Sequence, residues 1–397
     1  MKIFTVNAGS SSIKIKFFDN LSTILSIKIE EIGSTSAKAT LKYKDREYRV
    51  EDRVIKNHKE AISIIKELYH KADLANLLRD LDIIAHRVVH GGDRYSKALL
   101  LSKDSIESIK SFNHLAPLHN PINILAIESF FQEFPTTPQV AIFDTAFHQS
   151  MDRVSYSYPL PKDIIEQGKI RRYGFHGISY AYTTKEASKV LNIAQDKINL
   201  ISLHLGNGAS ITAIKDGKSV DTSMGMTPLA GLVMGTRCGD IDVSILTYMM
   251  KMGYSIEEIE NILNYQSGLK ALSGTNNIEE ITKRYLSGDE VAIDTINTYI
   301  HSIIKYIGSY AILLDRVDGI VFFAGVGENS SLIRELIIKK ISHLLKTQLN
   351  QELNSKKITK PTIISSSKSH IPLLVIPTNE ELQMAIEAQE YITQKSV

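Results

Sequence analysis

The chain has 397 residues, too many for one ordinary hydrophobic core, so two domains of about 150–200 residues each are expected. Hydrophobic residues make up 43% and charged residues 23%, and a net charge of +2 gives no support for a nucleic-acid or membrane partner. The single cysteine, Cys238, excludes an intramolecular disulfide, and residues 1–12 hold too short an apolar stretch for a secretory signal. We therefore expect a soluble cytoplasmic protein.

The first third of the chain predicts strands with two helices between them. Residues 13–18 alternate Ile-Lys-Ile-Lys-Phe, the period of a half-buried strand, and residues 121–134 carry helical periodicity with a proline at their start. The predicted order is β-β-β-α-β-α-β, with strands at residues 2–6, 13–18, 22–29, 83–89 and 140–143.

A similar order returns in the second half. Strands are predicted at residues 198–205, 210–214, 220–223, 319–324 and 373–376, and helices at 242–252, 256–264, 291–314 and 379–391. Residues 7–15 and 205–213 both run strand, Gly/Ser/Asn turn, strand, with Ser12-Ile13 matching Ser210-Ile211. This weak repeat and the recurring strand order predict two related α/β domains.

Three glycine-containing segments each follow an apolar strand, at residues 7–12, 206–209 and 325–329. We interpret all three as hairpin turns whose backbone N–H groups can approach a phosphate chain, with three ordinary turns as the alternative. A P-loop is incomplete because Thr212 stands where a glycine is required before Gly217-Lys218-Ser219. A Rossmann fingerprint also fails, since Ile211 and Ser330 replace its third glycine.

An arginine lies inside the β-branched segment His86-Arg87-Val88-Val89-His90, which ends at two glycines. Because a strand-interior arginine is costly to bury without an anion, we predict a bidentate carboxylate clamp at Arg87, with an edge-strand ion pair as the alternative. His86 and His90 would lie on the same face of the strand, as two metal ligands could. The sequence offers no third ligand at a suitable distance, so a metal site there is a weak hypothesis.

Three further residues suit phosphoryl chemistry. Asp144 ends a strand, where ligands gather in an open α/β sheet, although an N-cap is the alternative. His176 and Arg237 stand in glycine-flanked loops that a ligand can approach, with solvated side chains as the alternative. One histidine and one or two arginines in such loops match the charge on the equatorial oxygens of a transferring phosphoryl group.

Taken together, these segments resemble the acetate kinase family. The similarity runs in the family's order through residues 7–14, 86–92, 115–121, 143–148, 173–177, 204–208, 222–228, 235–242, 325–329 and 377–381. It implies a duplicated ribonuclease-H-like fold of the actin/hexokinase/Hsp70 superfamily with a central cleft, and a homodimer. The implied N-terminal α/β domain spans residues 1–150, joined by the helix at 379–397, and the nucleotide-binding domain spans 151–378.

The resemblance implies reversible transfer of a phosphoryl group from ATP to acetate, giving acetyl phosphate and ADP by direct in-line transfer. Mg²⁺, or Mn²⁺ in its place, would be held by Asn7 and Glu380. The implied catalytic residues are Arg87, Asp144, His176, Asn207 and Arg237, and the implied methyl pocket is Val89, Leu118, Phe175 and Pro228. Nucleotide contacts are assigned by resemblance to Ser10, Ser12, Lys14, His204, Leu205, Gly206, Asn207, Gly208, Asn277, Ile278, Glu279, Gly325, Val326, Gly327, Glu328 and Asn329.

The chain departs from the family pattern in one loop. The family's Ser-Gly-x-Ser-Ser-Asp-x-Arg adenosine loop corresponds to residues 273–280, which are one residue shorter, so that the usual arginine is either replaced by Glu279 or lost. Relaxed nucleotide selectivity is therefore expected.

Alternative functions remain open at this stage. Propionate kinases are close relatives, but they tend to carry a smaller residue at the position of Val89, which favours acetate here while both acids are expected to react. A sugar kinase of the same fold would need a catalytic base and polar sugar contacts. An actin-like or chaperone nucleotide switch would leave Arg87, Asp144, His176 and Arg237 without a purpose.

Overall fold

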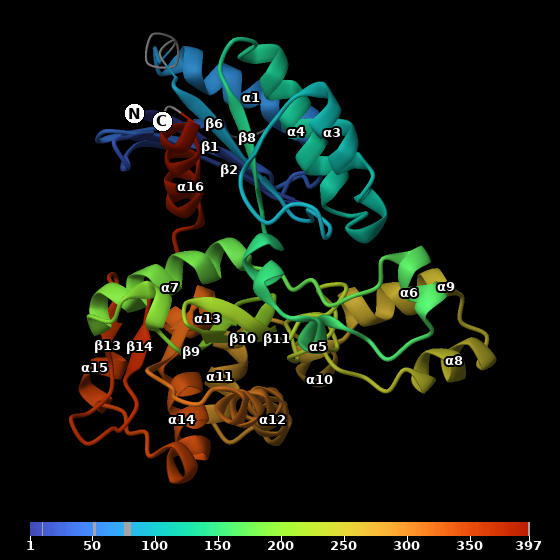
Figure 1. The fold of residues 1–397 in the computed structure, drawn as a ribbon, viewed down its shortest axis with the longest axis vertical. Coiled ribbons are helices and arrows are strands. Elements are labelled where there is room, and N and C mark those ends of the chain that lie inside the picture. The colour runs from blue at the N-terminus through green and yellow to red at the C-terminus, as the bar shows by residue number, and fades with distance from the viewer. Residues whose placement is uncertain (10, 51–52, 75–80, 396–397) are drawn as a thin grey trace. The chain divides into compact units, whose positions relative to one another are not determined.

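The computed structural model describes all residues except 10, 51–52, 75–80 and 396–397. By its internal contacts the chain divides into two compact units (Figure 1). Unit 1 comprises Met1–Ala146 together with Asn379–Val397, and unit 2 comprises Phe147–Thr378. Across the described residues, no helix combines the length and apolar character needed to cross a lipid bilayer.

Unit 1 is built on an eight-stranded sheet in the order β5-β4-β3-β2-β1-β6-β8-β7. Strands β1 to β5 form an antiparallel meander, whereas β1, β6 and β8 run parallel to one another. The parallel strands are buried along nearly their whole length, as expected where helices cover both faces. The bounds are β1 Lys2–Ala8, β2 Ile13–Asp19, β3 Ser22–Glu30, β4 Lys38–Tyr43, β5 Arg46–Val50, β6 Ile83–Val88, β7 Leu99–Leu100 and β8 Gln139–Phe143.

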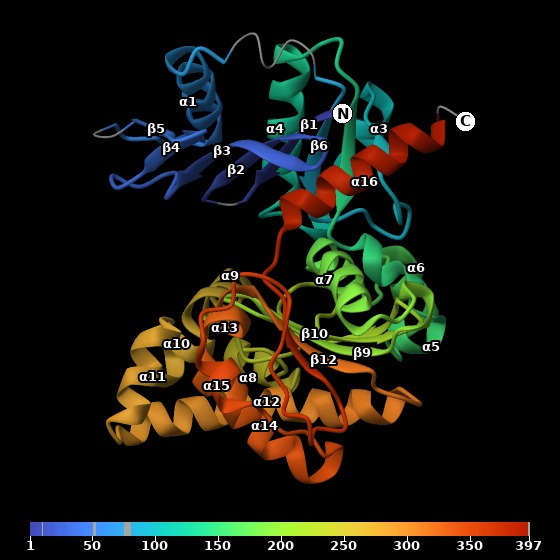
Figure 2. The ribbon, with the colours of Figure 1, turned by 90° about the vertical axis from the view of Figure 1, so that its left-hand side faces the viewer.

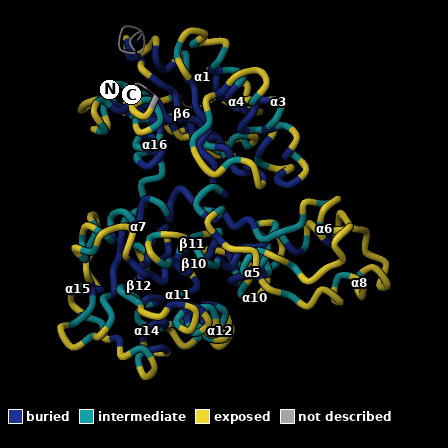
Figure 3. Tube along the Cα trace, viewed as in Figure 1, coloured by how far each residue is buried: buried dark blue, intermediate teal, exposed yellow. Residues whose placement is uncertain are grey.

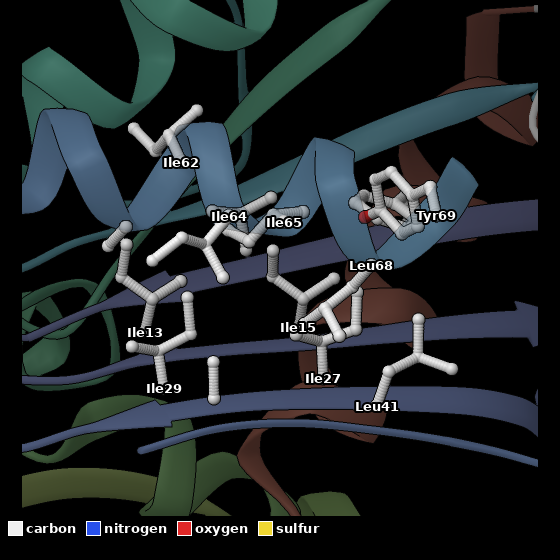
Figure 4. Packing of buried hydrophobic residues seen from close by; sticks show 14 of the residues in the cluster. Ile13, Ile15, Ile27, Ile29, Leu41, Ile62, Ile64, Ile65, Leu68 and Tyr69 are labelled. Carbon is white, nitrogen blue, oxygen red and sulfur yellow. The ribbon is translucent and has the colours of Figure 1, made fainter. Parts of the chain in front are cut away.

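Helices cover both faces of this sheet, and the alternation of the strands decides which residues meet them. Figure 4 shows isoleucines of β2 and β3 packed against Ile64, Ile65 and Leu68 of α1. Successive side chains of a strand point to opposite faces of the sheet, so Asn7 on β1 and Lys16 on β2 point to the other face. There they contact Glu380 and Glu381 of helix α16, which covers this face (Figure 2). Within the part of unit 1 that the structure describes, the α-helices are α1 His58–Lys71, α3 Lys103–Lys110, α4 Asn120–Glu133 and α16 Glu380–Lys395.

The predicted order of the first third is incomplete, because β4 and β5 precede the first helix. This hairpin lies at the outer edge of the sheet and turns at Lys44 with a positive φ of 52°. It buries little beyond Ala39 and Leu41, and although apolar residues occupy every second position from Ala39 to Tyr43, the residues between them are polar and the hairpin has no apolar run. Pairing with β3 therefore determines these strands more than their own composition does.

Unit 2 repeats the same arrangement in a six-stranded sheet, ordered β11-β10-β9-β12-β14-β13. Its β9, β10 and β11 form an antiparallel meander, and β9, β12 and β14 run parallel, as β1, β6 and β8 do in unit 1. The shared strand order confirms the duplicated α/β fold. The bounds are β9 Leu200–Leu205, β10 Ala209–Lys215, β11 Lys218–Thr222, β12 Gly319–Phe323, β13 Thr362–Ile363 and β14 Leu373–Val375.

The helices of unit 2 include the 24-residue α12, whose buried face contains Ile296, Ile300, Ile303 and Ile307. The helix predicted at 256–264 is observed as α9 followed by a π-helical turn at Ile262–Gln266. The helices are α5 Arg153–Tyr156, α6 Lys162–Gly168, α7 Gly177–Leu191, α8 Ser244–Lys251, α9 Ile256–Asn261, α10 Gly268–Ser273, α11 Ile278–Leu286, α12 Glu290–Leu313, α13 Ala324–Asn329, α14 Ser331–Leu345 and α15 Gln351–Ser355.

The prediction of a third hairpin turn at residues 325–329 is wrong, because these residues form helix α13. A hairpin needs an antiparallel neighbour, whereas β12 lies between the parallel strands β9 and β14. The chain must therefore leave the sheet in a crossover. Ala324 makes the sharp change of direction in the left-handed conformation, with φ of 62°.

Candidate active site

Three strand ends of unit 1 bring a polar cluster together. Asn7 lies on β1, Arg87 on β6, and Asp144 follows β8, and these parallel strands end at the same edge of the sheet. Arg87 Nε lies 3.1 Å from both carboxylate oxygens of Asp144, and Arg87 Nη2 donates to Asp144 as well. Arg87 Nη1 donates to Asn7 Oδ1 at 3.1 Å. The alternative considered for Arg87, an ion pair within the chain, is thus present, although β6 is a central strand and not an edge strand; the clamp on a substrate carboxylate stays a prediction.

Charge balance in this cluster depends on burial. Burial alone would lower the pKa of the Arg87 guanidinium, but the carboxylates of Asp144, Glu380 and Glu381 outweigh it and hold the pKa above its ordinary value. Burial raises the pKa of the Asp144 carboxyl, and Arg87 opposes that shift. Removing either partner would leave a buried charge without compensation, so the pair is expected to be sensitive to substitution.

The N-terminus of α16 adds a second carboxylate to this cluster. Asn7 Nδ2 donates to Glu380 Oε2 at 3.4 Å, and the neighbouring Glu381 pairs with Lys16 Nζ at 3.2 Å. An amide oxygen and a carboxylate are hard oxygen donors, which fit Mg²⁺ because that ion keeps several waters and needs few protein ligands. Among the described residues, no group of three or more His, Cys, Asp or Glu side chains could hold a metal by itself. The pair therefore fits a metal that arrives with phosphate oxygens.

Two asparagines of α4 fix the strand ends that carry the cluster. Asn123 Oδ1 accepts from the Val89 N–H at 3.0 Å, and its amide donates to the Ala8 carbonyl at 2.7 Å. Asn120 bonds both the N–H and the carbonyl of His90, each at 3.0 Å. Sequence reasoning missed both residues, although two asparagines three apart at a helix start after a proline-rich segment could have indicated them.

The two histidines that flank Arg87 have structural partners. His86 Nε2 lies 2.7 Å from Gln139 Oε1, and His90 Nδ1 accepts from the Gly92 N–H at 3.0 Å. Burial lowers the pKa of His86 to about 4 and that of His90 to about 3. Both rings therefore serve as buried hydrogen-bonding groups.

Unit 2 carries a glycine loop between β9 and β10. The Gly206 N–H bonds the Gly208 carbonyl at 3.1 Å, which closes the turn. Asn207 is held from two sides, since its carbonyl accepts from the Gly235 N–H at 2.9 Å and its Oδ1 accepts from Asn276 Nδ2 at 3.1 Å. A Cβ on Gly235 would lie 2.0 Å from Asn207 Oδ1, so any other residue there would displace the Asn207 side-chain amide.

His176 and Arg237 approach this loop together. A Cβ on Gly208 would lie 3.5 Å from both His176 Nε2 and Arg237 Nη1, so the absence of a side chain at Gly208 leaves space beside both donors. Arg237 Nη1 donates to the Pro228 carbonyl at 3.3 Å, and among the described residues the guanidinium has no carboxylate partner. Burial lowers its pKa. An anion that enters this space would lie close to two hydrogen-bonding groups, the guanidinium of Arg237 and the imidazole of His176.

A cavity of about 560 Å³ lies in unit 2 beside the same loop. Its size falls within the range of small-molecule sites, about 300–1,000 Å³. Its lining combines apolar side chains with amides, hydroxyls and one carboxylate: Gly206, Asn207, Gly235, Leu269, Asn276, Asn277, Ile278, Glu279, Thr282, Leu286, Gly325, Val326, Asn329, Ser330, Ser331 and Leu332. Eight of the residues assigned to nucleotide by resemblance lie in this lining: Gly206, Asn207, Asn277, Ile278, Glu279, Gly325, Val326 and Asn329.

Other predicted nucleotide residues lie elsewhere. Glu328 Oε1 accepts from the N–H and hydroxyl of Thr378. His204 stacks on His176 with ring centroids 3.8 Å apart. Leu205, Gly208 and Gly327 do not line the cavity, Ser12 and Lys14 belong to unit 1, and Ser10 lies outside the described residues.

The residues predicted to form a methyl pocket divide between the units. Val89 is buried and Leu118 exposed in unit 1, while Phe175 is buried and Pro228 half-buried in unit 2.

The Phe175 carbonyl lies 2.9 Å from His148 Nε2, and burial lowers the pKa of His148 to about 4.

A buried arginine that the sequence did not single out supports α13. Arg334 is 1% exposed and lies on α14. Its guanidinium donates to the carbonyls of Gly327 and Glu328 at 2.9 Å, and to Asn354 Oδ1 and O at 2.8 and 2.7 Å. It thereby pairs the last carbonyls of a helix that lines the cavity.

Comparison with known proteins gives a consistent result. The chain matches the acetokinase family over residues 2–386. It is 42% identical over 397 residues to an acetate kinase of Sulfurovum sp., covering 100% of both chains. It is 44% identical to an acetate kinase of Sulfurimonas denitrificans, covering 98% of this chain and 99% of the relative. A solved propionate kinase from Francisella tularensis is 40% identical with a TM-score of 0.91, covering 98% of this chain and 99% of that one.

Proposed function

Because the chain belongs to the acetokinase family, we propose that it transfers the γ-phosphoryl group of ATP to acetate, reversibly, giving acetyl phosphate and ADP. It is a phosphotransferase with a carboxyl group as acceptor. The observation that carries the proposal is the approach of His176 Nε2 and Arg237 Nη1 to Gly208, beside a cavity of nucleotide size. Such donors stabilise charge on the equatorial oxygens of a transferring phosphoryl group.

Arg87 is proposed to hold the acceptor carboxylate. Asp144 and Asn7 engage three of the five N–H donors of its guanidinium, which leaves one N–H on each terminal nitrogen for a substrate. Asp144 would orient and neutralise the guanidinium. A carboxylate is already nucleophilic, so this reaction needs alignment and charge neutralisation more than a general base.

Asn7 and Glu380 are proposed to help place Mg²⁺, with Mn²⁺ as a substitute. When bound with ATP, the ion would neutralise phosphate charge. In unit 2, Asn207, His176 and Arg237 would bind the phosphoryl oxygens, and the cavity beside them would take the nucleoside. Glu279 replaces the family's arginine in that cavity and has no ion-pair partner among the described residues, so we propose that adenine is held weakly and that GTP is also accepted.

Propionate is the alternative acceptor. Val89 is buried, and its N–H is fixed by Asn123, which favours the smaller acid. One methylene discriminates by only about 1–3 kcal/mol, so propionate is proposed as a slower second substrate.

Trapping of acyl phosphate with hydroxylamine tests the function directly. Purified protein with ATP, Mg²⁺ and acetate should give hydroxamate, with less from propionate and none from glycerol. Arg87→Ala should raise the KM for acetate and Arg237→Ala should mainly lower kcat, while Arg94→Ala, at an exposed arginine bonded to Ser108, should change neither. Absence of hydroxamate with both acids would refute the proposal.

We further propose that the protein is a homodimer. Helix α8 has no buried residue, and Val243, Tyr248 and Met252 around it expose 76%, 64% and 59% of their surface (Figure 3). An apolar face of this kind marks an interaction surface, and a two-fold pairing is the commonest solution. Light scattering should give twice the mass of the chain, and Tyr248→Lys with Met252→Lys should give a monomer. A monomeric parent protein would refute the pairing.

A further inference from the structure

The imidazole of His176 is held by contacts on several sides. Its ring lies parallel to that of His204, with centroids 3.8 Å apart and planes 4° apart. Its Nδ1 lies 2.9 Å from Ser210 Oγ on β10, and that oxygen lies 2.7 Å from Tyr180 Oη on α7. Ser210 and Tyr180 are fully buried. A continuous chain of polar atoms therefore runs from the core of unit 2 to the side of His176 that faces away from Gly208.

The surroundings of His176 oppose a positive charge on its ring. Arg237 Nη1 and His176 Nε2 each lie 3.5 Å from the place where a Cβ on Gly208 would stand, so the two nitrogens can be no further apart than twice that distance. A nearby guanidinium disfavours a second cation, and stacked imidazoles disfavour charging further. A neutral imidazole has one N–H only, so its tautomer decides whether Nε2 can donate.

The direction of the hydroxyl chain decides the tautomer. Ser210 has one hydroxyl proton for two neighbours, His176 Nδ1 and Tyr180 Oη. Tyr180 Oη also interacts with the hydroxyl of Thr212 and the backbone of His204, so the buried phenol has a partner whichever way the chain runs. If Ser210 donates to Nδ1, the one proton of the neutral ring lies on Nε2, the nitrogen on the Gly208 side, where a phosphoryl oxygen could accept it.

We propose that Ser210 and Tyr180 are positioning residues that hold the proton of His176 on Nε2, where it faces the glycine loop. The inference rests on the proposed function, because a transferring phosphoryl group gives that N–H a developing charge to stabilise. Ser210 and Tyr180 act through His176 and do not touch the substrate. The stacked His204 ring keeps the N–H directed toward Gly208.

Nitrogen-15 NMR of histidine-labelled protein tests the tautomer without turnover. His176, assigned by the loss of its signals in His176→Gln, should show an unprotonated Nδ1 and a protonated Nε2 at pH 8. Because this measurement needs neither ATP nor acetate, it separates failure of the inference from failure of the proposed function. A protonated Nδ1 in the parent protein would overturn the inference.

Kinetics of Tyr180→Phe provide the second test. This variant keeps the ring that packs on Phe323 and Phe147 and removes one hydroxyl. We expect kcat to fall about tenfold with unchanged KM values for ATP and acetate, by analogy with residues that orient catalytic ligands. The titratable and charged groups described near the His176 ring are His204 on β9, Arg237 and Tyr180. Tyr180→Phe removes the last of these and keeps His204 and Arg237.

The pH dependence distinguishes positioning from simple destabilisation. The parent kcat should stay level across the pH range in which the ring is neutral, because Nε2 then still donates. In Tyr180→Phe, kcat should fall as the ring loses its second proton with rising pH, because the neutral ring then divides between two tautomers. Ser210→Ala should behave like Tyr180→Phe, and Ser210→Thr, which restores a hydroxyl, should recover activity. A pH profile that keeps the parent shape in both Tyr180→Phe and Ser210→Ala would overturn the inference.

Discussion

Replacing Gly235 by alanine should disable the glycine loop while leaving the fold in place. The new Cβ would lie 2.0 Å from Asn207 Oδ1 and 3.2 Å from the Asn207 carbonyl oxygen. The Asn207 carbonyl is bonded to the Gly235 N–H at 2.9 Å, so the backbone pair cannot separate without losing that bond. The Asn207 side chain must therefore move by about 1 Å or more and leave its bond with Asn276.

The expected cost is larger for catalysis than for stability. Overpacking of this kind destabilises by about 1–3 kcal/mol. A displacement of about 1 Å in a group that binds the reacting phosphate can cost about 10²-fold in rate. We therefore expect kcat in the hydroxamate assay to fall about 10²-fold, with a small loss of thermal stability.

Gly308→Ala serves as the matched control. Gly308 lies inside α12, and a Cβ there would have open space within 4 Å. Alanine should raise helix stability there by about 0.5–1 kcal/mol and leave kcat unchanged. If Gly235→Ala retained the parent kcat, the placement of Asn207 against Gly235 would be refuted as a requirement of the reaction.

Three further substitutions test other parts of the structure. Arg334→Met should destabilise unit 2 by about 3–5 kcal/mol in urea titrations and raise the KM for ATP, because it leaves carbonyls of α13 unpaired. The pKa of His148 is about 4 in the folded protein and about 6.5 in the unfolded chain, so the parent protein should lose stability as pH falls between these values, by about 2 kcal/mol from pH 7 to 5. His148→Gln should remove this part of the pH dependence of the free energy of unfolding. Glu279→Arg should lower the KM for ATP about tenfold, because it replaces a cavity carboxylate by a cation.

Each of these three has a contrasting measurement. Arg153→Met, at an exposed position of α5, should leave stability unchanged, and equal loss in both arginine variants would count against the role of Arg334. If the free energy of unfolding of His148→Gln depended on pH as strongly as that of the parent protein, the imidazole of His148 would not be the group that resists protonation. Glu280→Arg adds the same charge to the next residue of α11, outside the cavity lining, so an equal effect would indicate a general charge effect.

The repeated sheet could be predicted because its central strands are apolar. β1, β6, β8 and their counterparts in unit 2 are buried along their length, and such runs stand out in a sequence. The β4–β5 hairpin could not be recognised in this way, since it is polar and depends on β3 for pairing. Helix α13 was mistaken for a hairpin because its glycines are typical of turns, whereas the direction of β12 is decided by distant strands.

The site was predictable only where residue chemistry was unusual for its setting. An arginine inside an apolar strand indicated an anionic partner, and the structure provides Asp144 for Arg87. The supporting residues gave no such signal. Asn123, Ser210 and Tyr180 are common residue types, and their role follows from partners 30 to 115 positions away in the chain, such as Ala8 for Asn123. Individual functions of the site residues remain predictions for the kinetic tests.

Helix α16 has a consequence for synthesis on the ribosome. It packs on β1 and β6, the earliest part of the chain, and begins with Glu380, the carboxylate bonded to Asn7. In the nascent chain, the face of the sheet that α16 covers therefore stays uncovered until the codons for residues 380–395 are translated. A chain that stops before residue 380 would lack both this helix and the carboxylate that is bonded to Asn7.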